Sequence, residues 1–192
     1  MQSRYELCEK PDSVSYASVA EVVNAAFASV NKIGINFGVN HLTGDELEQV
    51  LRENNGKCFV ALDGGRPVGT LSVVHRKYNM WFYKGDAMRL RFMAVLPEYS
   101  GQHIASGLVS LSISYCRDNA AQIITVSTPS NNKAAIHLYT KHSFSKIRYW
   151  WNQDHHVTDF AFWMNAEKPS RLSCAVHLLK DACRTRSKGR RA

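Results

Sequence analysis

Hydrophobic and polar positions along this chain follow two periods, one typical of helices and one typical of strands. Apolar side chains recur at three- and four-residue spacing in long segments, and shorter β-rich apolar runs lie between them. The pattern predicts, in order, a strand at 4–9, helices at 17–30 and 43–54, strands at 57–62, 67–75 and 89–95, a helix at 104–119, a strand at 122–127, a helix at 131–142, and strands at 144–151 and 157–165. This order predicts an α/β (α+β) domain built on one central mixed sheet.

Local signals set the ends of several predicted elements. Ser18 with Glu21, and Thr43 with Glu46, have the spacing of capping boxes and predict two helix starts. Asp63-Gly64-Gly65 between two apolar runs predicts a tight β-hairpin. Residues 76–86 are interpreted as a connection or a bulged strand extension.

The charge of the chain is concentrated at its C-terminal end. The 192 residues carry a formal charge of +8, with 45% hydrophobic and 21% charged residues, which is ordinary globular composition. Residues 168–192 hold eight basic side chains and one acidic side chain, while residues 1–167 hold sixteen and fifteen. The near-neutral charge of residues 1–167 argues against a nucleic-acid-binding domain. We therefore predict a domain at 1–166 and a basic helix or tail at 167–192.

Three interpretations of the tail at 168–192 remain open. It packs on the domain and ends in a solvated segment, it makes weak contact with anionic membranes, or it contacts nucleic acid. Aromatic residues are not interleaved with its cations, which argues against specific nucleic-acid recognition. The oligomeric prediction is a monomer or a homodimer.

The cysteines and the N-terminal residues predict a reducing compartment. Five scattered cysteines form neither a CxxC pair nor a spaced metal set, and His155-His156 after Asp154 lacks further ligands. The first ten residues are charged and lack an apolar core, and no run of about eighteen apolar residues occurs. We expect a cytoplasmic protein without a bound metal.

A candidate anion-binding turn lies between the predicted strand at 89–95 and the predicted helix at 104–119. Pro97 ends the strand, and small residues such as Gly101 and Ala105 follow. A strand, a small-residue turn and a helix N-terminus can gather unpaired backbone N–H groups around a pyrophosphate. An ordinary strand-to-helix connection is the alternative interpretation of this segment alone.

Two segments resemble the GNAT superfamily of N-acetyltransferases, which use acetyl-coenzyme A. The first runs from Val95-Leu-Pro97 through Gly101 to Ile104-Ala105, with Ser100 in place of the usual Arg or Gln and His103 in place of the central Gly. The second is Asn132-x-x-Ala135-x-x-Leu138-Tyr139-x-Lys141-x-Ser143-Phe144, in which Ser143 replaces Gly. The resemblance covers about residues 4–165, and its motifs lie within 89–144.

The resemblance implies a mostly antiparallel, twisted sheet that splays in its middle, flanked by helices. It implies acetyl transfer from acetyl-CoA to a primary amine of a small molecule, peptide or protein. The residues it assigns to the coenzyme are Met93, Ala94, Val95, Ser100, Gly101, Gln102, His103, Ile104, Ala105, Ser106, Asn132, Ala135 and Tyr139. Since Asn132, Ala135 and Tyr139 are spaced i, i+3 and i+7, they would share a helix face, and Tyr139 would protonate the departing thiolate as catalytic general acid.

Candidate residues for binding the acceptor lie on the predicted strand at 89–95 and at the margin of the sheet. Arg89 and Arg91 have the parity of Met93 and Val95 and are expected on one strand face, where they would bind an anionic substrate group. Aromatic residues of the sheet margin are further candidates for the acceptor pocket: Trp81, Phe82, Tyr83, Trp150 and Trp151. Arg89 stands where some family members carry a glutamate base, and His75, Asp86 and His137 are the substitutes. The second hypothesis is a member of the fold that binds CoA or a partner without turnover.

Overall fold

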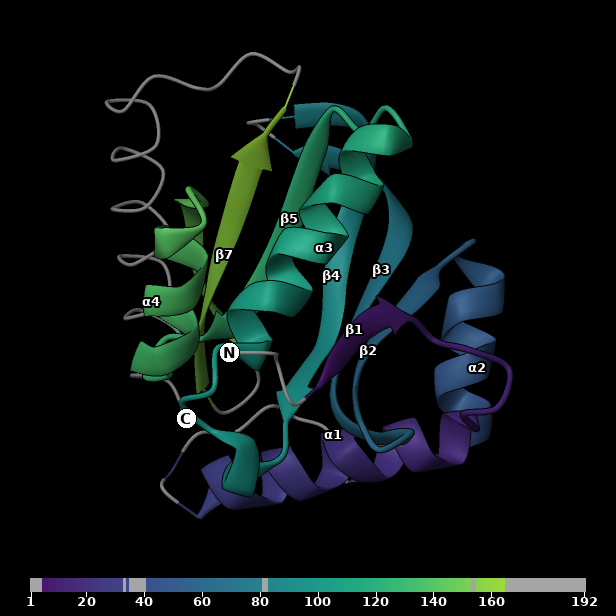
Figure 1. The fold of residues 1–192 in the computed structure, drawn as a ribbon. Coiled ribbons are helices and arrows are strands. Elements are labelled where there is room, and N and C mark those ends of the chain that lie inside the picture. The colour runs from purple at the N-terminus through teal and green to yellow at the C-terminus, as the bar shows by residue number, and fades with distance from the viewer. Residues whose placement is uncertain (1–4, 33, 35–40, 81–82, 153–154, 165–192) are drawn as a thin grey trace.

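Figure 1 shows the computed structural model of the chain, which describes residues 5–32, 34, 41–80, 83–152 and 155–164. The elements are β1 (Glu6–Glu9), α1 (Tyr16–Asn31), α2 (Gly44–Glu53), β2 (Lys57–Asp63), β3 (Arg66–Met80), β4 (Tyr83–Val95), the 3₁₀ turn η1 (Pro97–Tyr99), α3 (Ile104–Asp118), β5 (Ile123–Pro129), α4 (Lys133–Lys141), β6 (Ser145–Asn152) and β7 (His155–Trp163). Their order matches the order that the hydrophobic pattern predicts.

The strands form one seven-stranded sheet in the order β1-β2-β3-β4-β5-β7-β6. Every neighbouring pair is antiparallel except β4 and β5, which run parallel. A parallel pair needs a crossover, and α3 supplies it between these two strands. The mixed, mostly antiparallel sheet predicted from the sequence is confirmed.

The helices cover both faces of the sheet (Figure 1). A Cβ atom added at Gly69 of β3 would meet Ile104 and Leu108 of α3, so that residue faces α3. Val74, five residues along the same strand, lies beside Leu51 of α2. Because residues an odd number apart on a strand point to opposite faces, α3 and α2 lie on opposite sides of the sheet.

Capping explains where the first two helices begin. At α2, the Thr43 hydroxyl accepts from the Glu46 N–H at 3.2 Å while the Glu46 carboxylate accepts from the Thr43 N–H at 2.8 Å, which confirms the predicted capping box. At α1 the predicted cap is wrong, although the helix begins at Tyr16, one residue before the predicted bound. The cap is Ser15, three residues before Ser18, and its hydroxyl accepts from the Ser18 N–H at 3.1 Å.

Of the two interpretations of residues 76–86, the structure shows the strand extension, as part of a long hairpin. Strands β3 and β4 continue to pair from Val74↔Arg89 out to Met80↔Tyr83. Residues 75–77 are exposed, whereas Tyr78, Met80 and Tyr83 pack on a small apolar cluster around Ile147. The strands are continued by backbone pairing and by this partly buried face.

A close approach between α1 and α2 gives a stability prediction. A Cβ atom at Gly44 would lie 2.6 Å from the Ala17 nitrogen and 2.9 Å from its Cα, and neither backbone atom can move aside. We expect Gly44→Ala to lower the free energy of unfolding by about 2 kcal/mol, measured by urea denaturation.

Gly107→Ala is the matched control for that change. Its added Cβ would also be close, at 2.4 Å, but to the Cδ1 of Leu7, the end of a flexible side chain. The gain in helix propensity of up to about 1 kcal/mol offsets the adjustment of Leu7. Equal losses in the two variants would contradict the role assigned to the backbone contact.

Several sequence predictions lie outside the described residues. They are the tail at 167–192 with its domain boundary, and the side chains of Trp81, Phe82 and Asp154. Within the described part of the chain, no helix is both long and apolar enough to cross a membrane.

Candidate functional site

The centre of the sheet opens where β4 and β5 separate. Backbone pairing between them is confined to Met88↔Ile124 and Arg89↔Thr125, although β4 continues to Val95. Strand β5 meanwhile pairs with β7 as far as Pro129. The last residues of β4 therefore present backbone N–H and C=O groups on the β5 side that neither strand uses, as the resemblance implies.

A β-bulge in β4 sets the direction of the side chains at this opening. Thr70 pairs with Ala94 and Ser72 pairs with Arg91, so β4 holds one extra residue between these pairs. Phe92 has a φ of +53° there. The prediction that Arg89 and Arg91 share a face with Met93 and Val95 is therefore wrong, because the extra residue resets the alternation between the two halves of the strand.

The turn before α3 has the backbone that the anion-binding interpretation requires. Gly101 has a φ of +79°, and His103, the residue before α3, is left-handed with φ +64° and ψ +7°. His103 makes no side-chain cap, and the first hydrogen bond of the helix is Gly107 N–H to His103 C=O at 3.0 Å. The backbone N–H groups of residues 104–106 are left for a ligand, with the positive end of the helix dipole behind them.

Contacts from distant segments hold this turn in place. The Tyr99 hydroxyl donates to the Asp63 carboxylate at 2.7 Å, and the Tyr5 hydroxyl donates to the Gln102 carbonyl at 2.6 Å. The β2–β3 hairpin and the N-terminal strand thus brace the same few residues. Nothing in the sequence pattern points to either contact.

A groove of about 720 Å³, here the main groove, joins the turn to the β4 opening. Its wall is formed by Ala26, Phe27, Ser29, Val30, Met93, Ala94, Val95, Pro97, Tyr99, Ser100, Gly101, His103, Ile104, Ala105, Ser106, Asn132, Ala134, Ala135, His137, Leu138 and Lys141. Aspartate and glutamate are absent from this described wall. The structure therefore brings together every residue predicted for the coenzyme except Gln102 and Tyr139.

The four residues from α1 on this wall were missed by sequence reasoning. Since α1 packs near β3 and β4, its last turns close one side of the groove while α3 and α4 close the other. In sequence these residues form part of an ordinary apolar helix face, so no local signal separates them from core residues.

Helix α4 presents a wider surface to the groove than predicted. Ala134, His137, Leu138 and Lys141 line the wall at i, i+3, i+4 and i+7. Asn132 is 8% exposed and caps the helix, its side-chain oxygen accepting from the Ala135 N–H at 3.1 Å. Asn132 and Ala135 line the groove as well, as predicted.

Tyr139 lies behind that wall, in the core. It is 3% exposed, and its ring packs against Phe144 and Phe160 with centroids 5.8 Å from each. Burial raises the pKa of its phenol well above the ordinary value of 10.0. The phenol is therefore protonated at neutral pH, as a general acid must be, and its catalytic role stays a prediction.

A hydrogen bond joins the two helices that flank the groove. Ser106 Oγ on α3 and His142 Nε2 beyond α4 are 2.8 Å apart. Burial, followed by the nearby charge of Lys141, lowers the pKa of His142. Ser106 was predicted for the coenzyme from its motif position, whereas its bond to His142 could not be predicted.

The C-terminus of α4 explains how Ser143 fits where the family has glycine. Ser143 has a φ of +65°, and its N–H donates to the Thr140 carbonyl while the Phe144 N–H donates to the Tyr139 carbonyl, both at 3.0 Å. This pattern is a Schellman motif, which favours glycine at the left-handed position. His103 adopts the same left-handed conformation at its own position, so both replacements retain a glycine-like backbone.

Ser143→Gly is expected to raise the free energy of unfolding by about 1 kcal/mol, because it relieves the left-handed backbone of a residue with a Cβ atom. Urea denaturation measures the change. Thr140→Gly, at an exposed helical position in the last turn, is the control and should lower stability by about 0.3 kcal/mol. A loss of stability in Ser143→Gly would contradict the strain argument.

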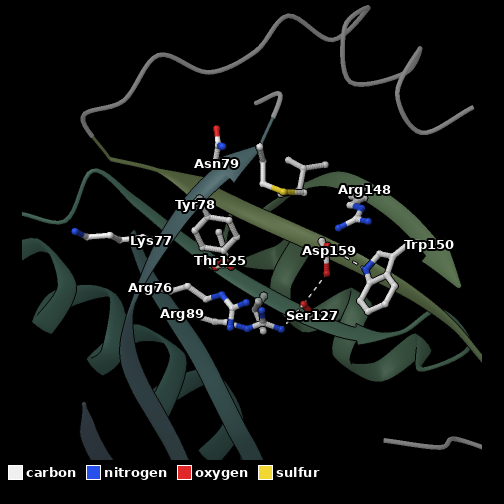
Figure 2. Close-up of a pocket in the computed structure, with 13 residues that line it drawn as sticks. Arg76, Lys77, Tyr78, Asn79, Arg89, Thr125, Ser127, Arg148, Trp150 and Asp159 are labelled. Carbon is white, nitrogen blue, oxygen red and sulfur yellow. Dashed lines mark hydrogen bonds between the residues drawn. The ribbon is translucent and has the colours of Figure 1, made fainter. Parts of the chain in front are cut away.

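A second cavity, here the basic cavity, has a volume of about 300 Å³ and lies along β3, β4, β5, β6 and β7 (Figure 2). It is lined by Arg76, Lys77, Tyr78, Asn79, Met80, Arg89, Thr125, Val126, Ser127, Ile147, Arg148, Trp150 and Asp159. Arg76 and Tyr78 have the strand parity of Val74, which faces α2. The basic cavity is therefore on the α1–α2 face of the sheet, away from α3 and α4.

The residues predicted for the acceptor are divided between several places. Arg89 and Trp150 line the basic cavity, whereas Arg91 lines neither cavity and lies over the Phe92 ring at 4.7 Å. The Tyr83 hydroxyl donates to the Asp86 carbonyl at 2.8 Å, and its ring packs on the small cluster around Ile147.

Of the three candidate bases, only His137 lines the main groove. His75 and Asp86 are exposed on the β3–β4 hairpin, where His75 pairs with Met88 and Asp86 pairs with Lys77. Among the residues that the structure describes, no group of three or more His, Cys, Asp or Glu side chains is arranged to hold a metal ion.

Comparison with known proteins agrees with this geometry. The profile of the acetyltransferase (GNAT) family matches residues 25–144. N-alpha-acetyltransferase 30 of Schizosaccharomyces pombe is 32% identical over 93 residues, which are 47% of this chain and 58% of that protein. The match thus spans little more than half the length of that relative.

Solved structures share the fold. The acetyltransferase yncA of Salmonella typhimurium, solved with its cofactor acetyl-CoA, superposes with a TM-score of 0.67 at 14% identity, covering 87% of this chain and 97% of that one. A chain of the NatC complex bound to Gag peptide and CoA superposes with a TM-score of 0.65 at 16% identity, covering 83% and 99%.

Proposed function

The chain belongs to the acetyltransferase (GNAT) family and is an acyltransferase, and from this premise we propose that it transfers the acetyl group of acetyl-CoA to the α-amino group of a peptide or protein. The observation that carries the choice of amine is the wall of the main groove. In its described residues that wall holds no carboxylate to serve as a base for a strongly basic amine.

The basicity of the acceptor amine decides whether the enzyme needs a strong base to deprotonate it. An α-amino group has a pKa of about 7.7–8.0 and a lysine side chain one of about 10.4. At pH 7.5 roughly a third of the first is neutral, against roughly one part in a thousand of the second. An enzyme without a strong base therefore favours an α-amino acceptor. The similarity to N-alpha-acetyltransferase 30 supports the same choice.

The main groove fits the coenzyme. The N–H groups at the start of α3 suit its pyrophosphate, and the small side chains of Gly101 and Ala105 let the phosphates approach the backbone. The unused backbone groups at the end of β4 suit the amide-bearing arm that carries the thioester. The described wall holds no acidic side chain and includes Lys141, so it does not repel the phosphates.

The chain's own residues then have defined tasks. The backbone of Met93–Val95 orients the thioester and stabilises the charge that develops on its carbonyl oxygen. As the amine attacks, a C–N bond forms, the C–S bond breaks, and the amine releases its proton to solvent. We assign the proton for the departing thiolate to Tyr139, although its ring lies in the core behind the groove wall, because its phenol is protonated and is carried by the helix that lines the groove. Most of the acceleration comes from holding the amine against the carbonyl.

The test compares two peptides of the same length, one with a free N-terminus and no lysine, the other with a blocked N-terminus and one lysine. Release of the CoA thiol reports turnover, and calorimetry reports acetyl-CoA binding. We expect the free N-terminus to be acetylated at least about a hundredfold faster. Faster acetylation of the lysine, or of a small amine from a parallel panel, would overturn the choice of acceptor. Tight coenzyme binding without turnover on any amine would overturn the whole proposal.

The remaining partner predictions are part of the same proposal. Cytoplasmic location is supported by Cys58 and Cys116, which are buried free thiols.

Weak contact of residues 168–192 with anionic membranes rests on their charge, and liposome binding with and without this segment tests it. Unchanged binding after truncation would rule the contact out, and light scattering distinguishes monomer from homodimer.

A further inference from the structure

The basic cavity and the main groove both use residues of β4, Arg89 in the cavity and Met93–Val95 in the groove. The main groove has walls from α1 and from α3, which means that it reaches the α1 side of the sheet. The basic cavity is on that same side and uses Arg89 of β4 with Thr125 and Ser127 of β5. An acceptor that approaches the opening from the α1–α2 face therefore passes the basic cavity.

The cavity concentrates positive charge on an otherwise balanced domain. Three arginines bring guanidinium groups to its lining (Arg76, Arg89 and Arg148), whereas the Lys77 side chain points away from them (Figure 2), and Asp159 is its one lining acid among the described residues. Residues 1–167 as a whole hold nearly equal numbers of basic and acidic side chains. The excess is thus a local feature, and the basic tail does not account for it.

A chain of hydrogen bonds fixes Arg89 and occupies Asp159 (Figure 2). Arg89 Nη2 donates to Ser127 Oγ at 2.9 Å, and Ser127 Oγ donates to Asp159 Oδ1 at 2.6 Å. Trp150 Nε1 donates to Asp159 Oδ2 at 3.0 Å. Both carboxylate oxygens therefore already have partners, and the network holds the Arg89 guanidinium at the cavity wall.

The other arginines are held against aromatic rings. The Arg148 guanidinium lies 5.2 Å from the Trp150 ring centroid, and that of Arg76 lies 6.0 Å from Tyr78. Tyr78 is itself anchored, with its hydroxyl 2.7 Å from Thr125 Oγ1. Within the described residues, no carboxylate is within 4.0 Å of Arg76 or Arg89.

Like charges gather here although they repel one another. Burial lowers the pKa of Arg91, and the neighbouring Arg89 and Arg76 lower it further. Keeping such cations together costs free energy in the free protein, and a bound anion would recover it. Planar guanidinium groups suit a carboxylate, which accepts paired hydrogen bonds.

We propose that the basic cavity binds an acidic side chain at the second to fourth residue of the acceptor peptide, an inference that rests on the proposed function. Because the bulge at Phe92 takes up one residue, Met93, which we place beside the reacting thioester, is about three strand residues along β4 from Arg89, or about 10 Å. An extended peptide covers that distance in about three residues, so an acidic group near its N-terminus can reach the cavity while its amine is at the opening.

The test uses peptides with a free N-terminus that differ only at positions two to four, carrying three glutamates, three glutamines or three lysines. We expect the glutamate peptide to have a kcat/KM at least about tenfold above the glutamine peptide, mainly through a lower KM. Arg76→Gln combined with Arg148→Gln should remove most of that preference, and Arg76→Glu should shift it toward the lysine peptide. Arg117→Gln, on the exposed end of α3, makes the same charge change far from the cavity and should keep the preference.

Each outcome decides between the two proposals. Equal kcat/KM for the glutamate and glutamine peptides overturns the basic-cavity inference and leaves the proposed function intact. A preference that falls as much in Arg117→Gln as in the cavity variants also overturns it. If no peptide is acetylated, the proposed function fails, and calorimetry of the glutamate peptide with CoA present decides the inference. Tighter binding than the glutamine peptide, lost in Arg76→Gln, supports the cavity, and equal binding overturns it.

Discussion

Replacing Tyr139 with phenylalanine is expected to lower kcat by about a hundredfold while leaving acetyl-CoA affinity unchanged. The change removes one hydroxyl and keeps the ring that packs on Phe144 and Phe160, so the core and the groove wall stay intact. What is lost is the proton for the departing thiolate, and general acids contribute about a hundredfold or more. Steady-state kinetics with calorimetry of the coenzyme separates the two effects.

The pH profile gives a second signature of the same role. A general acid acts in its protonated form, and burial moves the pKa of Tyr139 above 10.0. Below pH 10, the wild-type rate should therefore not fall through deprotonation of Tyr139. Any rise of the rate with pH in this range reports deprotonation of the acceptor amine. Tyr139→Phe should keep that rise at a lower overall rate.

Tyr115→Phe is the control. It removes a hydroxyl from a half-buried tyrosine of α3, whose ring packs edge-on against Phe59. It should leave kcat unchanged. If Tyr139→Phe retained wild-type turnover and coenzyme affinity, the thiolate would receive its proton from another group, and Tyr139 would have a structural role only.

The elements of this fold could be predicted from sequence because local signals and tertiary packing agree. The capping box at Thr43 and the Asp63-Gly64-Gly65 turn are both used as predicted. The turn at 97–103 was recognisable for the same reason, since Pro97 and Gly101 leave the chain few alternatives. Its role in binding was implied by resemblance to a family and by the helix N-terminus that follows.

The directions of side chains at the site could not be predicted in the same way. The bulge at Phe92 shifts alternation by one residue, and no glycine marks it in the sequence. For α4, the spacing of Asn132 and Tyr139 is compatible with one face, but packing against Phe160 turns Tyr139 into the core. The basic cavity joins residues up to 83 positions apart, from Arg76 to Asp159, so only the tertiary fold brings its charges together.

Ala135→Trp is expected to weaken acetyl-CoA binding at least about a hundredfold. Ala135 lines the main groove together with Met93–Val95 of β4, and an indole there would occupy space that we propose for the thioester-bearing arm. Excluding about 120 Å² of apolar surface from the groove costs about 3 kcal/mol, which corresponds to a factor of about 150 in affinity. Calorimetry with acetyl-CoA measures this change.

The matched control places the same indole on the same helix. Thr140 is exposed, does not line the groove, and is at the opposite side of α4. Thr140→Trp should bind acetyl-CoA as the wild type does, and equal thermal midpoints for the two variants would show that the helix tolerates the residue. Wild-type affinity in a folded Ala135→Trp variant would mean that the coenzyme arm does not run past α4.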